Sequence, residues 1–271
     1  MSGKKTEATG LVPALPLAQR LRRFTDARVA LGRAGSGLPT EAHLRFMLDH
    51  ARARDAVLSA LDLDAVTAGI ERLGLEVIRV RSEAADRASY LRRPDLGRRL
   101  LAEDRAKLAP HAGSERIALV VADGLSATAV AQNTAPLLDA LRARLGRTGL
   151  SIGRAVLVEQ GRVAIGDPIG EALGAELAIV LLGERPGLSA ADSLGCYITY
   201  EPRPGTPDSR RNCISNIRPG GHGYEQAAGK IAWLAAEALT RKLTGVQLKE
   251  AAPGVLDNED TPAPILPESG A

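Results

Sequence analysis

Apolar positions follow two different patterns along the chain, and the change falls near residue 114. Beyond it, continuous apolar runs alternate with helical patterns: runs at 116–122, 155–158 and 176–183, and helices at 126–145, 169–173 and 224–243. Runs that are apolar on both faces and alternate with helices are typical of parallel strands covered on both sides. The sequence therefore predicts an α/β fold over residues 113–250, a Rossmann-like parallel sheet flanked by helices.

The chain before this point is predominantly helical in pattern. Residues 16–61 show apolar positions at helical spacing, with Leu44, Met47 and Leu48 at i, i+3 and i+4, and three glycines between 32 and 37 divide this stretch in two. A short strand over 76–80 and a helix over 95–108 follow. We therefore expect a helical N-terminal region, residues 16–112, that docks on another subunit. Residues 1–15 and 251–271 lack periodicity and are predicted to be flexible tails.

Composition and net charge limit the binding partners and the cellular location that we expect for this chain. The 35 Lys and Arg against 32 Asp and Glu leave a net charge of +3, and only 3% of residues are aromatic, so no nucleic-acid partner is expected. Apolar runs of six residues are far shorter than the roughly 20 needed to span a bilayer, so no membrane span is expected. With no export signal, Cys196 and Cys213 should stay reduced, which favours a cytoplasmic location.

Polar residues beside glycines mark the ends of the predicted strands, where open parallel sheets bind their ligands. Glu184 follows the run at 176–183, where it is placed either to accept hydrogen bonds from a ligand or to pair with Arg185. Asp123 ends the first run. Because Ser126 follows three residues later, helix capping is the favoured interpretation there.

Other signatures of chemistry are weak. A G-x-G-x-x-G motif after a strand and a phosphate-binding G-x-x-x-x-G-K-[ST] motif are both missing, and the four histidines lack metal-ligand spacing, so no metal site is expected. Cys213 follows a basic loop that would favour a thiol nucleophile, but no Cys/His pairing surrounds it. A contact role is favoured for this cysteine.

Seven blocks of sequence, in the same order from about residue 18 to 248, resemble the small (light) subunit of adenosylcobalamin-dependent ethanolamine ammonia-lyase. The blocks lie at 28–35, 90–98, 121–126, 161–163, 169–171, 183–188 and 212–217. The resemblance implies a subunit that assembles with a large barrel subunit, which holds the substrate. Together the subunits would convert ethanolamine to acetaldehyde and ammonia by a radical route.

The resemblance also implies a cofactor site without catalytic residues in this chain. Its cobalamin contacts fall on Val163, Glu184 and Cys213. Because no Asp-x-His-x-x-Gly motif is present, the adenosylcobalamin should keep its own base on the cobalt. The resemblance further implies a hetero-oligomer, which is cytoplasmic or enclosed in a bacterial microcompartment. The alternative function is a non-catalytic cobalamin-binding or assembly module of another complex.

Overall fold

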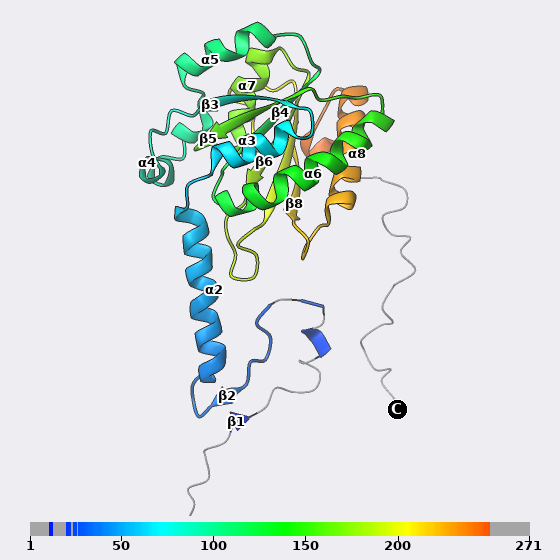
Figure 1. Ribbon diagram of the computed structural model, residues 1–271. Coiled ribbons are helices and arrows are strands. Elements are labelled where there is room, and N and C mark those ends of the chain that lie inside the picture. Colours follow the sequence, from blue (N-terminus) through cyan, green and yellow to red (C-terminus); the bar gives the residue numbers. More distant parts are fainter. Residues whose placement is uncertain (1–10, 13–19, 23, 26, 250–271) are drawn as a thin grey trace, which may run out of the picture.

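A six-stranded sheet forms the central layer of the computed structural model, which describes residues 11–12, 20–22, 24–25 and 27–249 (Figure 1). The strands lie in the order β3-β5-β4-β6-β7-β8. Their bounds are β3 (Glu76–Arg81), β4 (Ile117–Ala122), β5 (Arg154–Glu159), β6 (Leu177–Gly183), β7 (Leu194–Tyr200) and β8 (Arg211–Ile217). The first four in this order are parallel, whereas β7 and β8 are each antiparallel to the strand before them. The predicted α/β fold is confirmed, with a sheet that is mostly parallel.

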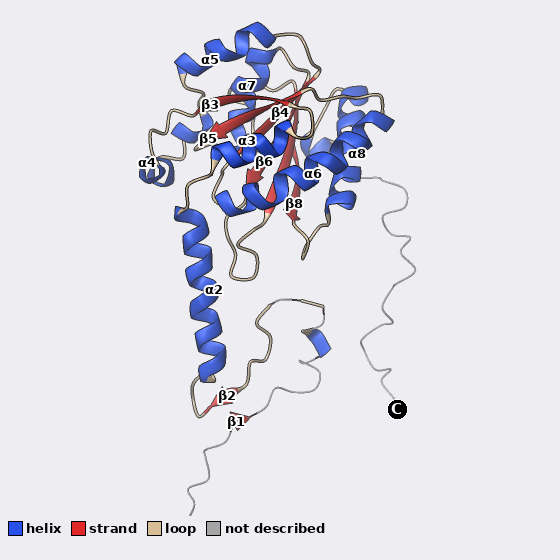
Figure 2. Ribbon diagram, in the orientation of Figure 1, coloured by secondary structure: helices blue, strands red, loops and turns tan. Residues whose placement is uncertain are grey.

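Helices cover the two faces of the sheet unequally (Figure 2). The helices α3 (Leu63–Glu71), α6 (Ala127–Arg147) and α8 (Tyr224–Arg241) enclose the larger core on one face. The helices α5 (Ala102–Leu108) and α7 (Gly166–Leu173) enclose a smaller core on the other. On this second face α7 packs against β4 and β6, while the helices that contact β7 and β8 lie on the first face. The second face of β7 and β8 is therefore left open to a ligand.

The N-terminal part of the chain contains one helix that projects from this layered unit (Figure 1). This helix, α2 (Thr40–Leu58), matches the second half of the predicted helical stretch. In the first half, described residues 20–21 are helical, whereas residues 27–39 are extended or turned. Gly32 and Gly35 adopt positive φ there, and β2 (Arg33–Ala34) pairs antiparallel with β1 (Leu11–Val12). The other residues of the two predicted tails lie outside the described part of the chain.

Residues 63–112 are built into the layered unit rather than attached to it. They supply α3, β3 at the sheet edge, α4 (Arg87–Arg92) and α5. The single helix predicted over 95–108 is instead a short 3-10 turn, η1 (Leu96–Arg98), then an extended link, then α5. Backbone hydrogen bonds with the segment 81–83 hold this link in an extended conformation: the N–H of Leu101 donates to the carbonyl of Arg81, and the N–H of Glu83 donates to the carbonyl of Arg99. Within the described residues, no helix has the length and apolar character to cross a membrane.

Candidate ligand cleft

The candidate site lies at the point in the sheet where successive strands are added on opposite sides of β4. The strand β4 is followed by α6 on one face and then by β5, and β5 is followed by α7 on the other face and then by β6, on the far side of β4. In open α/β sheets the ligand crevice forms at such a point, beyond the carboxyl ends of the strands. The ends of β4 and β6 approach so closely that a Cβ at Gly183 would collide with the backbone of Asp123 and Ser126. Glycine is therefore required there.

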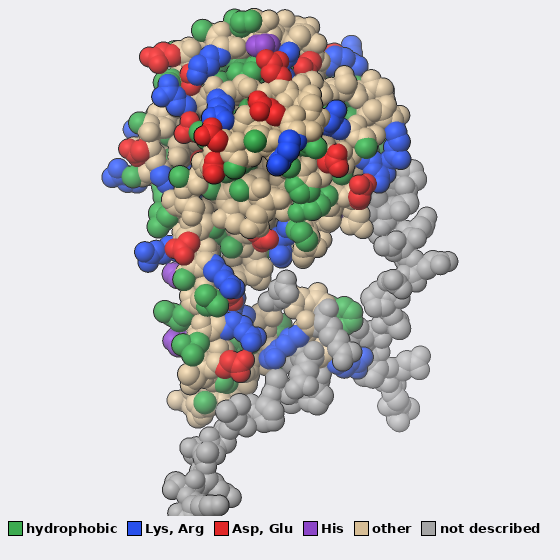
Figure 3. Space-filling view, viewed as in Figure 1, with side chains coloured by type: hydrophobic (Ala, Val, Ile, Leu, Met, Phe, Trp, Pro, Cys, Tyr) green, Lys and Arg blue, Asp and Glu red, His purple; other side chains and the backbone are tan. Residues whose placement is uncertain are grey.

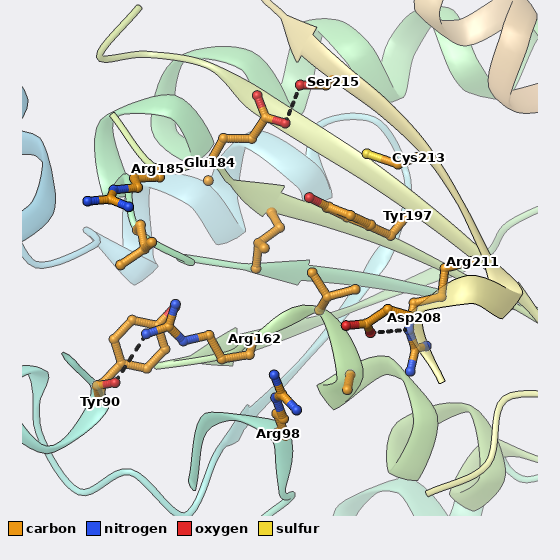
Figure 4. Close-up of a pocket in the computed structure, with 15 residues that line it drawn as sticks. Tyr90, Arg98, Arg162, Glu184, Arg185, Tyr197, Asp208, Arg211, Cys213 and Ser215 are labelled. Carbon is orange, nitrogen blue, oxygen red and sulfur yellow. Dashed lines mark hydrogen bonds and ion pairs between the residues drawn. The ribbon is translucent and has the colours of Figure 1, made fainter. Parts of the chain in front are cut away.

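An open cleft of about 650 Å³ occupies this edge and continues onto the uncovered face of β7 and β8 (Figure 4). Its lining combines apolar side chains, two tyrosines, several arginines and two carboxylates. These residues are Tyr90, Arg98, Leu125, Arg162, Val163, Ala164, Leu182, Gly183, Glu184, Arg185, Tyr197, Asp208, Arg211, Cys213 and Ser215.

All three residues that the resemblance implies for cofactor contact line this one cleft. Val163 begins a 3-10 turn, η3 (Val163–Ile165), directly after the β5 loop and is half-buried. Glu184 follows β6. Cys213 lies in β8 directly opposite Tyr197 of β7, and part of its surface is exposed to solvent while its thiol is partly buried. The fold thus brings together three positions that are well separated along the chain, and their role as cofactor contacts stays a prediction.

The Glu184 carboxylate is held by β7 and β8. It accepts a short hydrogen bond from the Ser193 hydroxyl, one of 2.6 Å from the Ser215 hydroxyl and one of 3.0 Å from the backbone N–H of Asn216. Figure 4 shows the carboxylate turned toward Ser215 and away from the Arg185 guanidinium. The alternative of a pair with Arg185 is therefore not the arrangement that the structure shows.

A β-bulge explains why Glu184 meets these donors. Between Leu194 and Cys196 the register of β7 against β8 shifts, so that Ser215 and Asn216 together oppose Gly195. A bulge leaves backbone groups without a partner in the ladder, and Glu184 accepts from one of them. Gly195 leaves room for the carboxylate, because a Cβ there would lie 2.8 Å from Glu184 Oε1.

Cys213 lacks the environment of a nucleophile. Burial raises the pKa of its thiol, the negative charge of Glu184 raises it further, and only the hydrogen bond with Tyr197 acts in the opposite direction. Reactive cysteines need a lowered pKa, because the thiolate is the nucleophile. A contact role agrees better with this environment.

Asp123 is not in the cleft lining; it is buried behind it. Its carboxylate accepts the backbone N–H of Gly161 at 3.1 Å and lies 3.6 Å from the Arg87 guanidinium. Burial raises the pKa of Asp123 to about 6, against the lowering effect of Arg87. Ser126 caps α6 by accepting the N–H of Ala129, so the capping function at this turn belongs to Ser126. Asp123 thus has a structural role that holds the β4 and β5 ends together.

Sequence reasoning missed the aromatic and basic side chains of the cleft. Tyr90 and Arg98 are the first and last residues of the block at 90–98, and Arg162 lies in the block at 161–163. Spacing along the sequence does not show that these two blocks meet in the fold. The Arg162 guanidinium lies 4.1 Å above the centre of the Tyr90 ring, which is a cation–π contact. Among the described residues, no three of His, Cys, Asp or Glu gather as a metal-ligand set.

The fold and the cleft together define an α/β protein with an open cleft at the carboxyl edge of a mostly parallel sheet. A family model described as ethanolamine ammonia-lyase light chain (EutC) matches residues 17–249. The chain belongs to this family, as the seven sequence blocks predicted. The family is that of a lyase, so the prediction of an enzyme subunit is confirmed as well.

Relatives of known name support the same assignment. The ethanolamine ammonia-lyase small subunit of Azotobacter vinelandii is 54% identical over 238 residues, which cover 86% of this chain and 88% of the relative. The small subunit of Xanthomonas campestris is 50% identical over 254 residues, covering 92% and 93%, and that of Rhodopseudomonas palustris is 51% identical over 239 residues, covering 88% and 92%. A small subunit implies a larger partner.

Proposed function

We propose that this chain is the small subunit of an enzyme that converts ethanolamine to acetaldehyde and ammonia by an adenosylcobalamin-dependent radical mechanism. In this proposal a large barrel subunit holds the substrate, and the small subunit helps to bind the cobalamin and to assemble the complex. The observation that carries the proposal is the single cleft that collects Val163, Glu184 and Cys213.

The side chains of the cleft fit a corrin, which has an apolar ring edge and a rim of amide side chains. Val163, Leu182 and Tyr197 offer apolar surface, and Glu184 offers an acceptor for amide hydrogens. Arg162 offers donors, since its buried Nε has no hydrogen-bond partner within the described residues. The cleft is open along one side, as a ligand shared with a second subunit requires.

When bound, adenosylcobalamin supplies the radical chemistry. The residues of this chain contact the corrin, orient it and exclude water from the face that they cover. The missing Asp-x-His-x-x-Gly motif is the feature of this chain that favours a cofactor with its own base on the cobalt.

The helix α2 is the part of the N-terminal region that we propose as the docking element for the large subunit. Exposed apolar side chains occur along it, at Leu44, Met47, Leu48 and Leu58, with 49–62% of each side chain accessible (Figure 3). An exposed apolar stripe on a projecting helix is typical of a protein–protein interface. The assembled complex would be a cytoplasmic hetero-oligomer, and cell fractionation tests whether it is enclosed in a microcompartment.

Coexpression with the large subunit tests the proposed function. The two chains should purify together, and the complex should release acetaldehyde from ethanolamine in a coupled assay only when adenosylcobalamin is added. A complex that binds cobalamin without turnover would instead favour a non-catalytic cobalamin-binding or assembly module. Failure of the chains to purify together would contradict the proposal.

A further inference from the structure

The arginines that line the cleft fall into two groups, according to whether a carboxylate neutralises them. Arg211 is neutralised: it donates two hydrogen bonds, of 2.7 and 2.8 Å, to the buried carboxylate of Asp167, and a third to Asp208. Arg98, Arg162 and Arg185 form no ion pair with any carboxylate among the residues that the structure describes. Arg185 follows Glu184 directly in the sequence, whereas Arg98 and Arg162 lie on the opposite side of the cleft from Glu184 (Figure 4).

The fold brings the segments that carry Arg98 and Arg162 side by side. The backbone N–H of Arg162 donates to the carbonyl of Gly97 at 2.7 Å, which joins the η1 turn to the loop after β5. A side chain at position 97 would prevent this contact, because a Cβ there would lie 2.8 Å from Arg162 Cγ and 3.0 Å from the Tyr90 ring. Both side chains line the same cleft, so an anion bound between them would interact favourably with two positive charges.

Most hydrogen-bond donors of Arg162 are also left for a ligand. Its Nη2 donates to the carbonyl of Tyr90 at 3.3 Å, and its Nε is buried without a partner within the described residues. The cation–π contact fixes the guanidinium over the Tyr90 ring. A guanidinium that is positioned in advance and retains its donors is suited to a phosphate group.

The cleft is polarised as a result. Arg98 and Arg162 lie on one side, where the nearby Asp208 is already paired with Arg211 (Figure 4). Glu184 lies on the other side with Cys213 and Ser215, and there the charge of Arg185 offsets that of Glu184. Cobalamin has a matching asymmetry, because its corrin amides are neutral whereas the phosphodiester of its nucleotide loop carries a negative charge. Resting on the proposed function, we infer that Arg98 and Arg162 form an anion site for this phosphodiester, and that the Glu184 side of the cleft faces the corrin amides.

Corrinoids that differ in the nucleotide loop test this inference on the reconstituted complex with the large subunit. Cyanocobalamin carries the phosphodiester, cobinamide phosphate carries a phosphate without the base, and dicyanocobinamide carries neither. Equilibrium dialysis, read by corrin absorbance, gives each dissociation constant. We expect Arg98→Ala and Arg162→Ala each to weaken cyanocobalamin and cobinamide phosphate about 10- to 100-fold, and to leave dicyanocobinamide unchanged.

The matched control removes the same charge elsewhere. Arg241 lies in the last turn of α8, away from the cleft lining, and is exposed with an ion pair to Glu237, so Arg241→Ala should change none of the three affinities. Arg98 is exposed, so its variant should fold even if loss of the Tyr90 contact destabilises Arg162→Ala.

Equal weakening of the binding of all three corrinoids, or unchanged cyanocobalamin affinity in both variants, would overturn the inference. A wild-type complex that binds no corrinoid would instead overturn the proposed function on which it rests.

Discussion

At Glu184, a single carboxylate both closes a β-bulge and lines the cleft. Its Oε2 accepts from Ser193 and from the backbone of Asn216, and its Oε1 accepts from Ser215. A carboxylate has about four lone-pair positions, so one position on Oε1 is left for a donor from a ligand. The strands therefore orient this acceptor before any ligand binds.

Replacing Glu184 by Gln should weaken cofactor binding. The amide places a donor among donors, and a hydrogen bond to a charged acceptor contributes about 1.5 to 3 kcal/mol, equivalent to about 10- to 150-fold in affinity. Turnover of the complex should be nearly restored at saturating adenosylcobalamin, because the proposal places the substrate on the other subunit. Titration of the cofactor into the Glu184→Gln complex measures the half-saturating concentration.

Ser215→Ala provides the control for this effect. It removes one hydroxyl donor to Glu184 but keeps the carboxylate, so the bulge is disturbed while the acceptor remains. The half-saturating concentration should then stay close to that of the wild type. Equal increases in both variants would mean that Glu184 acts only through the bulge.

Burial of Asp123 should make stability depend on pH. Its pKa in the folded chain is raised from 3.8 to about 6 by desolvation, so between these values the folded state binds more protons than the unfolded state. The free energy of unfolding should therefore fall as pH rises from about 4 to 6, by about 3 kcal/mol for this group. Urea unfolding of the full chain at a series of pH values measures this slope.

Asp123→Asn should flatten that slope. The amide keeps an oxygen to accept from Gly161 but no longer titrates. Some slope should remain, because burial also raises the pKa of Asp167. Parallel curves for the wild type and the variant would show that Asp123 does not titrate in this range.

At the scale of elements, the sequence predicted the edge strand β3 and the central strands β5, β4 and β6. Each residue of β4 and β6 is buried, so an unbroken apolar run identified them. The strand β8 was missed because it follows a loop rich in Pro and Gly and presents polar and small residues to the open cleft. The helix α3 was also missed, since its nine residues merge with the apolar sequence around them.

The candidate site was predictable where it depends on strand ends and not where it depends on tertiary contacts. Glu184 follows β6 directly and Val163 begins the turn after the β5 loop, so the pattern placed both near the ligand edge. The segments of Arg98 and Arg162 meet through a backbone contact between η1 and the loop after β5. No local pattern encodes that contact, and the break in the helix predicted over 95–108 has the same cause.

The exposed stripe on α2 leads to a prediction about assembly. Leu44 and Leu48 lie one turn apart on this helix, and burying a leucine contributes about 1.5 to 3 kcal/mol. Replacing either by Lys should weaken the complex with the large subunit by about 10-fold or more. Because both side chains are already exposed, the stability of the chain alone should change by less than about 0.5 kcal/mol.

Arg45→Ala is the control on the same helix. This side chain is exposed and pairs with Glu41 one turn earlier, an interaction that contributes little to stability. Analytical ultracentrifugation of the mixed subunits measures the affinity of each variant. Leucine variants that assemble as tightly as the wild type would place the interface elsewhere on the chain.

At the scale of the whole molecule, the cleft contains contact groups but no set of reactive groups. The Cys213 thiol and the Tyr197 hydroxyl both have a raised pKa because of burial, so neither ionises readily at neutral pH. The Glu184 carboxylate is engaged by three donors, and Arg211 is neutralised by Asp167. A general base needs a pKa near the working pH, and neither the Cys213 thiol nor the Tyr197 hydroxyl has one.

The chain alone should therefore show no ethanolamine turnover, with or without adenosylcobalamin, although its cleft is already formed. Adding the large subunit to the same preparation should start acetaldehyde release, and the rate should saturate as the small subunit is titrated into a fixed amount of the large one. The Leu44→Lys chain should reach the same maximal rate at a higher concentration, because its defect lies in assembly. Turnover by the folded, isolated chain would contradict this division of labour, since the acid, base or radical site would then have to lie within this subunit.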